Sequence, residues 1–388
     1  ISMAGTPSYR KSLGLVGLVS LGVGGTIGSG IFVVPGIAAQ LSGVWSLCAW
    51  LIVAVSASCV LLSLASVSSR FTDSGSFYSL FESVFGRKAA VPLIVLYLMS
   101  SLFGISTIAA GIGQYLGYFG LTQVLLIEIG IIAGFCCINI IGIALSGKTE
   151  TVLTIIKIFP LILIALLLLP FIRMENFVPA APLTTVGLFA TIIIVYWPFT
   201  GFEISAIPVE ETTDPRLIRK SLIFVMAIVV SVYLLLNVAL IGSVGVGILA
   251  ASPAPVAAAA ALVTKDAGVV VACIGIAAML SAINAYIVGT SRILQNLSAR
   301  SGIPLLRDLG AQGTPAYALI VGCGIGAGLL LFSNHFDQLA SISVITTLIP
   351  YLFFCIASWI LITGTRMRLV SAAGAISTLA ILCLYFLL

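Results

Sequence analysis

Five glycines lie between positions 22 and 30, in the middle of an apolar segment that covers residues 13–39. Glycine loses the most backbone freedom on ordering, so a lipid-facing helix would gain nothing from this cluster. A helix that unwinds in mid-membrane and offers bare N–H and C=O groups to a ligand would need it. We predict that the N–H groups of Ser29, Gly30 and Ile31 open a second half-helix and hold a carboxylate at its positive end.

A second apolar segment is interrupted at Trp197-Pro198-Phe199-Thr200-Gly201-Phe202-Glu203. Two broken spans in corresponding halves of a membrane protein are a sequence sign of a binding site between them. Glu203 has two interpretations. It is either a structural acid bonded to backbone N–H groups freed by the break, or a gate or proton acceptor with Trp197, Phe199 and Phe202 as aromatic walls.

Lys157 is a charged residue inside an apolar segment, residues 151–171, and lies about 14 Å deeper than Lys148 by helical rise. A charge at that depth usually faces a cavity or a partner, and snorkelling to the interface is the alternative. Lys157 would then either titrate or act as a fixed cation where a sodium ion would otherwise sit. Glu128 falls nearer the end of its own apolar segment and is interpreted as interfacial.

The composition is that of an all-α polytopic membrane protein. The 388 residues are 61% hydrophobic and 7% charged, whereas a soluble domain carries about 25% charged residues. The net charge of +5 comes from residues scattered over short loops, which excludes a nucleic-acid partner. With a lone His335 and no CxxC pair, the sequence predicts no metal site and no cofactor. The alanine run at 257–261 predicts a short surface helix.

Eleven apolar segments are long enough to cross a membrane. Fourteen Lys and Arg residues fall on the side of the N-terminus and two, Arg173 and Lys265, on the other. This asymmetry predicts a cytoplasmic N-terminus in a multi-pass protein of the cytoplasmic (inner) membrane. The predicted spans are 13–39, 44–69, 89–119, 121–143, 151–171, 185–208, 220–246, 268–298, 315–333, 337–363 and 370–388.

At these residues the chain resembles the amino acid–polyamine–organocation transporter superfamily. The specific motifs are Gly28-Ser29-Gly30-Ile31-Phe32, the second break at 197–203, Glu211-Thr212-Thr213-Asp214-Pro215 and the segment 343–352. The resemblance implies a LeuT-like fold with broken helices 1 and 6. Its two inverted five-helix repeats would cover 13–171 and 185–363, with an additional span at 370–388. The family usually has twelve spans, so either a twelfth helix is missing from this chain or this is a short member, and a homodimer stays open.

The resemblance also implies roles for individual residues. Thr26 and Thr200 would offer carbonyls to an amino group, and Asn284 takes the place of a tryptophan found in the arginine/agmatine exchangers. Taken singly, Asn284, Ser281 and Thr290 are more typical of interhelical hydrogen bonds than of a binding site. The implied substrate-binding residues are Thr26, Ile27, Gly28, Ser29, Gly30, Trp197, Thr200, Gly201 and Asn284. The implied gating residues are Tyr97, Trp197, Phe199 and Phe202, and the ion-coupling residues are Lys157 and Glu203.

The resemblance therefore implies a sodium-independent carrier of amino acids or amines that works by exchange or by proton symport. Members with a lysine at the position of Lys157 work without sodium. An arginine/agmatine-type or polyamine antiporter is the alternative. A channel would need a continuous polar stripe, and a membrane enzyme would need a catalytic cluster, neither of which the sequence contains.

Overall fold

The computed structural model describes residues 14–68, 76–142, 147–203, 212–214, 216–301, 306, 308 and 314–387, and this part of the chain is helical. Seven helical stretches are long and apolar enough to cross a membrane, and the first of them, Leu15–Val67, holds two of the predicted spans. Three shorter apolar helices, at Leu125–Ile141, Thr185–Phe199 and Ala316–Phe332, supply the others. The prediction of about eleven spans is confirmed.

Most helix bounds lie within a few residues of those expected, and the first span is broken in two. The end of the predicted sixth span, residues 204–208, lies outside the described residues, as do Glu211 and Pro215 of the 211–215 motif. The first half of the molecule contains α1 (Leu15–Thr26), α2 (Ser29–Ser42), α3 (Ser46–Val67), α5 (Arg87–Gly117), α6 (Leu125–Ile141) and α7 (Gly147–Leu168). The second half contains α8 (Thr185–Tyr196), the 3-10 turn η5 (Trp197–Phe199), α9 (Arg216–Ala251), α11 (Lys265–Ser301), α13 (Ala316–Phe332), α14 (Phe336–Leu361) and α15 (Thr365–Leu387).

Two short helices join the long ones. The helix α4 (Ser76–Phe85) was not predicted, and it packs against α5 and α14 at one end of the molecule. The helix α10 (Pro255–Ala260) was predicted to lie on the surface, and the structure corrects this. Val256, Ala257 and Ala259 are fully buried because α10 packs against α9, α11 and α2.

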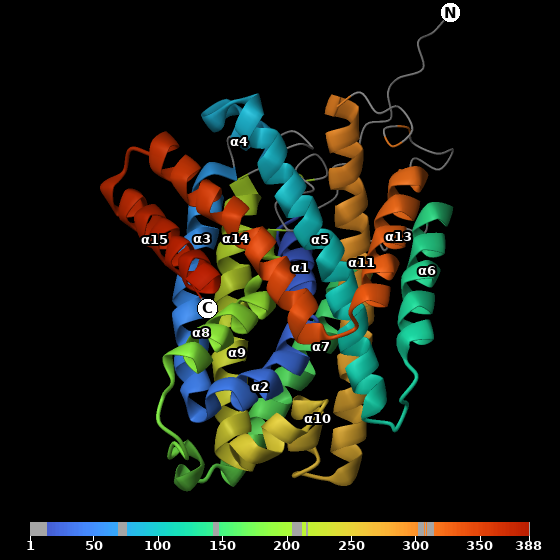
Figure 1. Cartoon of the computed structure of the whole chain (residues 1–388), viewed down its shortest axis with the longest axis vertical. Helices are drawn as coiled ribbons and strands as arrows, with labels where there is room; N and C mark the ends of the chain where they lie inside the picture. The colour runs from blue at the N-terminus through green and yellow to red at the C-terminus, as the bar shows by residue number, and fades with distance from the viewer. Residues whose placement is uncertain are drawn as a thin grey trace, which may run out of the picture.

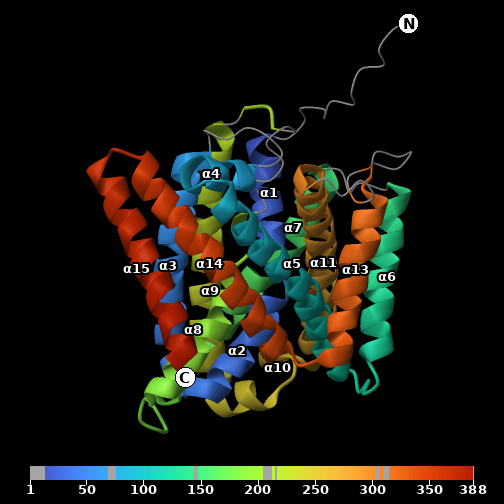
Figure 2. The ribbon, with the colours of Figure 1, turned by 45° about the horizontal axis from the view of Figure 1, so that its top comes forward.

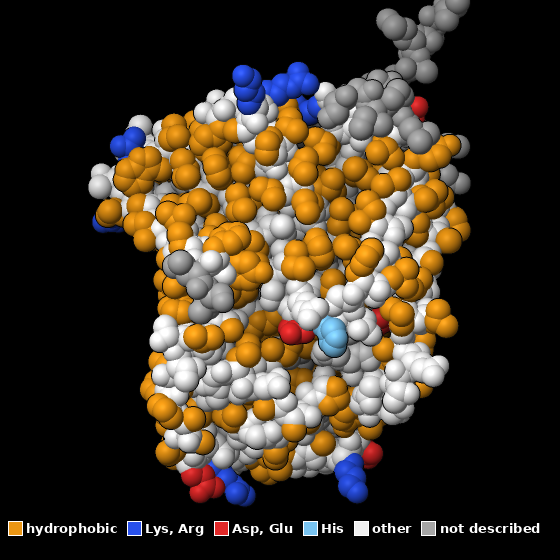
Figure 3. Space-filling view, in the orientation of Figure 1, with side chains coloured by type: hydrophobic (Ala, Val, Ile, Leu, Met, Phe, Trp, Pro, Cys, Tyr) orange, Lys and Arg blue, Asp and Glu red, His pale blue; other side chains and the backbone are white. Residues whose placement is uncertain are grey.

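The broken helix α1–α2 lies in the interior of the bundle, with α15 on one side and α6 and α13 on the other (Figures 1 and 2). The helix α5 runs through the middle and packs against α11 and α14. Figure 3 shows hydrophobic side chains over the middle of the molecule and Lys and Arg at its two ends. This distribution is the one that a bilayer-spanning bundle requires.

Hydroxyl groups fasten α15 to its neighbours. Ser63 on α3 donates to Ser371 on α15 at 3.2 Å, and Ser371 shares a 2.8 Å hydrogen bond with Ser358 on α14. Nearer the middle, Ser56 on α3 shares hydrogen bonds with Ser377 on α15 at 2.8 Å and with Tyr196 on α8 at 3.2 Å. Such hydrogen bonds, with small residues at the contacts, hold helices together where lipid gives no hydrophobic drive.

Glu128 lies in the first turn of α6, near the end of its span as the sequence suggests, but its side chain is buried. Its side chain is only 2% exposed and lies against Gly113 of α5, where any Cβ would overlap the carboxyl group. The small size of Gly113 creates the space that buries this acid. Its Oε2 atom has no hydrogen-bond partner among the described residues.

Candidate functional site

The first break separates α1, which ends at Thr26, from α2, which begins at Ser29. Between them Ile27 and Gly28 have left the helical conformation, and Thr26 turns its hydroxyl back onto the Gly22 carbonyl at 2.7 Å. Gly28 is the N-cap residue of α2 and has no side chain that could accept a capping hydrogen bond. The first N–H groups of α2 are therefore without a side-chain cap from this residue. The predicted half-helix with an open positive end is present.

The second break lies directly against the first. A Cβ added to Gly30 would stand 2.6 Å from the Cα of Pro198, so only glycine allows the two breaks this close. Gly201 has a φ of +92°, which favours glycine, and a Cβ there would stand 2.7 Å from the Gly25 carbonyl oxygen. The glycines of the two breaks therefore serve close backbone approach as well as unwinding.

A small cavity, here called the break cavity, opens where the two breaks meet. Thr26, Gly28, Ser29 and Gly30 line it from the first break, and Trp197 and Thr200 from the second. Its remaining walls are formed by Gly25, Ile108, Ala282 and Tyr286. The cavity thus combines the open N-terminus of α2 with apolar and aromatic walls, and no charged side chain among the described residues lines it.

Trp197 covers the N-terminus of α2. Its Nε1 donates to the Ser29 hydroxyl at 3.2 Å, and its ring lies 6.0 Å from that of Tyr286. A Cβ at Gly104 of α5 would overlap the Tyr286 ring, so α5 fits closely behind this aromatic pair. Trp197 and Tyr286 together close one side of the break cavity.

Two side chains donate to the backbone carbonyls beside the first break. Lys157 is 2% exposed and donates from Nζ to the Gly24 carbonyl at 3.1 Å. This burial rules out the snorkelling alternative. The Tyr233 hydroxyl of α9 lies 3.1 Å from the Thr26 carbonyl and 3.1 Å from the Pro198 carbonyl, so it joins the two breaks. Sequence reasoning missed Tyr233, although a hydroxyl deep in an apolar span is a signal that could have singled it out.

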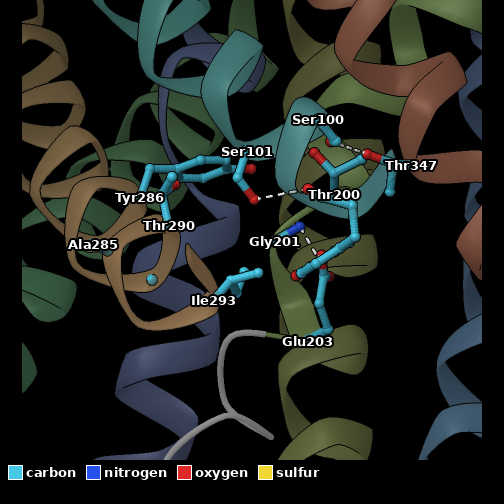
Figure 4. Close-up of a pocket in the computed structure, with 12 residues that line it drawn as sticks. Ser100, Ser101, Thr200, Gly201, Glu203, Ala285, Tyr286, Thr290, Ile293 and Thr347 are labelled. Carbon is cyan, nitrogen blue, oxygen red and sulfur yellow. Dashed lines mark hydrogen bonds between the residues drawn. The ribbon is translucent and has the colours of Figure 1, made fainter. Parts of the chain in front are cut away.

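A second cavity, here called the Glu203 cavity, adjoins the first and shares Thr200 and Tyr286 with it (Figure 4). Glu203 Oε1 accepts from the Tyr97 hydroxyl at 2.9 Å. Its Oε2 accepts from the Tyr351 hydroxyl at 2.6 Å and from the Gly201 N–H at 3.1 Å. The bond to Gly201 is the structural interaction expected of an acid in a break, and the tyrosines tie Glu203 to α5 and α14.

Several predicted site residues lie outside the two cavities. The Asn284 side chain turns to α6, where its Oδ1 accepts from Asn139 at 2.7 Å, and Tyr286 two residues later faces the cavities instead. Phe199 packs between Trp50 and Tyr233, with ring centroids 5.9 and 5.2 Å away.

Phe202 and Ile27 also point away from the cavities. The Phe202 ring packs against Tyr351 at 5.3 Å. Ile27 is fully buried and lines neither cavity. The residues that the structure does bring together at the break cavity are Thr26, Gly28, Ser29, Gly30, Trp197 and Thr200. Gly201, Tyr97 and Glu203 line the Glu203 cavity.

A helical membrane protein in which two broken helices face one cavity has the architecture of a secondary transporter. The chain matches the amino acid permease family over residues 13–388 and belongs to that family. It is 27% identical to the inner membrane transport protein YbaT of Escherichia coli over 95% of this chain and 91% of that protein. It is 24% identical to the branched-chain amino acid permease BcaP of Bacillus subtilis over 91% and 81% of the two chains.

A solved structure shares the fold. The crystal structure of MhsT in complex with L-phenylalanine matches with a TM-score of 0.73 and 12% identity, over 98% of this chain and 99% of that one. The LeuT-like fold that the family resemblance implies is therefore confirmed. Together with the family, it makes this chain a membrane transporter of amino acids rather than an enzyme.

Trp197→Leu should weaken amino acid binding by about three- to tenfold, because an aromatic contact contributes about 0.5–1.5 kcal/mol and the bond to Ser29 is lost as well. Binding by the purified protein would be measured by isothermal titration calorimetry. Trp359→Leu is the matched control, since Trp359 is 44% exposed on α14 and lies in neither cavity. Wild-type affinity in a folded Trp197→Leu protein would show that Trp197 does not cover bound substrate.

Proposed function

We propose that this permease is a sodium-independent secondary active transporter of neutral amino acids that works by alternating access. The observation that carries the proposal is the pair of internal donors at the breaks. In carriers with broken helices, the unwound carbonyls coordinate the coupling ion. Here the Lys157 ammonium donates to the Gly24 carbonyl, and the Tyr233 hydroxyl, which has one proton to share, lies 3.1 Å from the carbonyls of both Thr26 and Pro198. A sodium ion would have to displace both donors.

The preference for neutral substrates follows from the walls of the break cavity. The substrate carboxylate would bind the N–H groups of Ser29 and Gly30 at the positive end of α2. The side chain would then meet Ile108, Trp197 and Tyr286, which offer apolar surface and no countercharge. A branched-chain permease among the relatives and a phenylalanine-bound structural neighbour agree with this substrate class. The arginine/agmatine-type alternative lacks a charged partner in this cavity.

Alternating access would proceed by opening the two cavities in turn. Trp197 would leave Ser29 to open one side of the break cavity, while Phe199 would stay packed between Trp50 and Tyr233. Tyr97 and Tyr351, which hold Glu203, would separate to open the other side, and Phe202 would follow Tyr351. Ile27, which is fully buried in the first break, would hold the unwound segment in the protein interior.

The overall arrangement in the membrane belongs to the same proposal. The N-terminus would be cytoplasmic, as the Lys and Arg asymmetry predicts. The two inverted repeats would be 13–171 and 185–363, with 370–388 as an additional span. Lys157 and Glu203 are the candidate groups for proton coupling, should transport prove to be symport rather than exchange.

Uptake of radiolabelled neutral amino acids into proteoliposomes tests the proposal. Uptake should saturate and should be the same when choline replaces sodium. Vesicles with and without unlabelled amino acid inside, and with and without an acid-outside gradient, separate exchange from proton symport. Uptake that requires a sodium gradient would contradict the assignment of Lys157 and Tyr233 as replacements for the ion.

A further inference from the structure

The Glu203 cavity has no role in the binding of the substrate carboxylate or side chain described above. It lies on the other side of Thr200 and Tyr286 from the break cavity. Its lining residues include Glu203, with its carboxylate, and Tyr97, Ser101 and Thr290, with their hydroxyl groups. Both cavities are small.

The hydrogen bonds already made within the protein show which of these oxygens can still accept a hydrogen bond from a ligand. Tyr97 donates its proton to Glu203, Ser101 donates to the Tyr97 carbonyl at 3.1 Å, and Thr200 donates to the Trp197 carbonyl at 2.8 Å. A hydroxyl has one proton and two lone pairs. Each of these three oxygens has therefore spent its proton within the protein and retains lone pairs, so the lining is rich in acceptors.

Thr290 adds a hydroxyl whose lone pairs accept no hydrogen bond from the described residues. Its side chain is 1% exposed, it lines the cavity, and its Oγ1 has no hydrogen-bond partner in the described part of the chain. A buried hydroxyl without a partner costs free energy, so native structures rarely keep one without a ligand or water. The Thr290 hydroxyl therefore indicates that this cavity binds a ligand.

The charge of the cavity selects the kind of ligand. Both oxygens of Glu203 accept hydrogen bonds from Tyr97, Tyr351 and Gly201, an arrangement that suits the ionised carboxylate. No Lys or Arg among the described residues lines the cavity. A buried anion surrounded by acceptors calls for a cationic ligand that brings several N–H donors.

We propose that the Glu203 cavity is a subsite for a primary ammonium group, with Glu203 and Thr290 as its acceptors. The inference rests on the proposed function, because the ammonium group reaches this subsite from the adjoining break cavity. Thr200 and Tyr286 form the shared wall, so movement of Tyr286 would join the two cavities. A substrate leaving the break cavity would place its ammonium here, and a free amine without a carboxylate would bind here directly.

Calorimetric titration of the full-length protein with isoamylamine and, separately, with leucine tests the subsite. Thr290→Val should weaken isoamylamine binding by about ten- to hundredfold, the effect of one lost hydrogen bond to a charged group, and leave leucine affinity unchanged. Glu203→Gln should weaken the amine further. The matched control is Thr378→Val, because Thr378 is fully buried on α15 and bonds only to carbonyls of its own helix.

Equal amine affinity in Thr290→Val and Thr378→Val, or displacement of the amine by excess sodium chloride, would overturn the subsite. If leucine uptake fails while the amine still binds in a Thr290-dependent way, the proposed function is wrong and the ammonium site remains. Radiolabelled isoamylamine distinguishes the two sources of the ammonium. Uptake of isoamylamine would show that the protein transports amines. Binding without uptake would show that the subsite serves the ammonium group of amino acids during transport. Either result supports an ammonium site.

Discussion

Replacing Lys157 by methionine is expected to reduce amino acid uptake by about ten- to hundredfold, because a buried carbonyl left without its donor costs about 1–3 kcal/mol. The affected carbonyl is that of Gly24, three residues before the first break. Methionine keeps most of the side-chain length and apolar stem, so the helices can stay packed. Initial rates of uptake into proteoliposomes, in sodium and in choline, would measure the effect.

Stability separates this functional role from a structural one. The substitution removes the desolvation cost of the buried ammonium but leaves the Gly24 carbonyl without this donor, so the two effects on the free energy of unfolding oppose each other. The thermal unfolding midpoint of Lys157→Met should therefore change little while uptake falls. Lys265→Met serves as control, since Lys265 is exposed at the start of α11. Wild-type uptake by Lys157→Met would remove Lys157 from the coupling mechanism.

Gly30→Ala is expected to abolish measurable uptake and to lower the free energy of unfolding by about 1–3 kcal/mol, the usual cost of overpacking. The added Cβ would stand 2.6 Å from the Pro198 Cα, a backbone atom that cannot rotate away. The two breaks would have to separate, which would displace the Trp197 ring from Ser29. Uptake and thermal unfolding of the same preparation would be compared.

The control for this substitution is Gly324→Ala on α13. A Cβ at Gly324 meets nothing within 4 Å, so the change should be neutral or should stabilise the helix by up to about 1 kcal/mol. Retention of uptake in Gly30→Ala would mean that the breaks can move apart without loss of the site. The contact between Gly30 and Pro198 would then be incidental to transport.

The sequence predicts the spans and the breaks because both depend on local composition. Apolar length sets the spans, and the clusters around Gly28 and Gly201 mark where a helix cannot continue. The open end of α2, the covering position of Trp197 and the buried environment of Lys157 all follow from these features. The mechanism that the family resemblance implies can then be assigned to residues whose position in the fold has been predicted from the sequence.

The directions of side chains could not be predicted in the same way. A membrane helix is apolar on all sides, so its sequence does not show which face meets the protein and which meets lipid. Asn284 and Tyr286 differ by about 200° around α11, and only packing decides that Tyr286 faces the cavities. The burial of Glu128 depends on Gly113 in the neighbouring helix, and the bridging position of Tyr233 depends on both breaks.

Hydrogen bonds between hydroxyl groups connect α15, which has an exposed apolar surface, to the edge of the break cavity. Ile376 of α15 is 68% exposed on the apolar surface, while the next residue, Ser377, bonds to Ser56. Ser56 in turn bonds to Tyr196, which directly precedes Trp197. A thicker or thinner membrane changes the tilt of a spanning helix such as α15. Only three side chains, those of Ser377, Ser56 and Tyr196, separate such a movement from the edge of the break cavity.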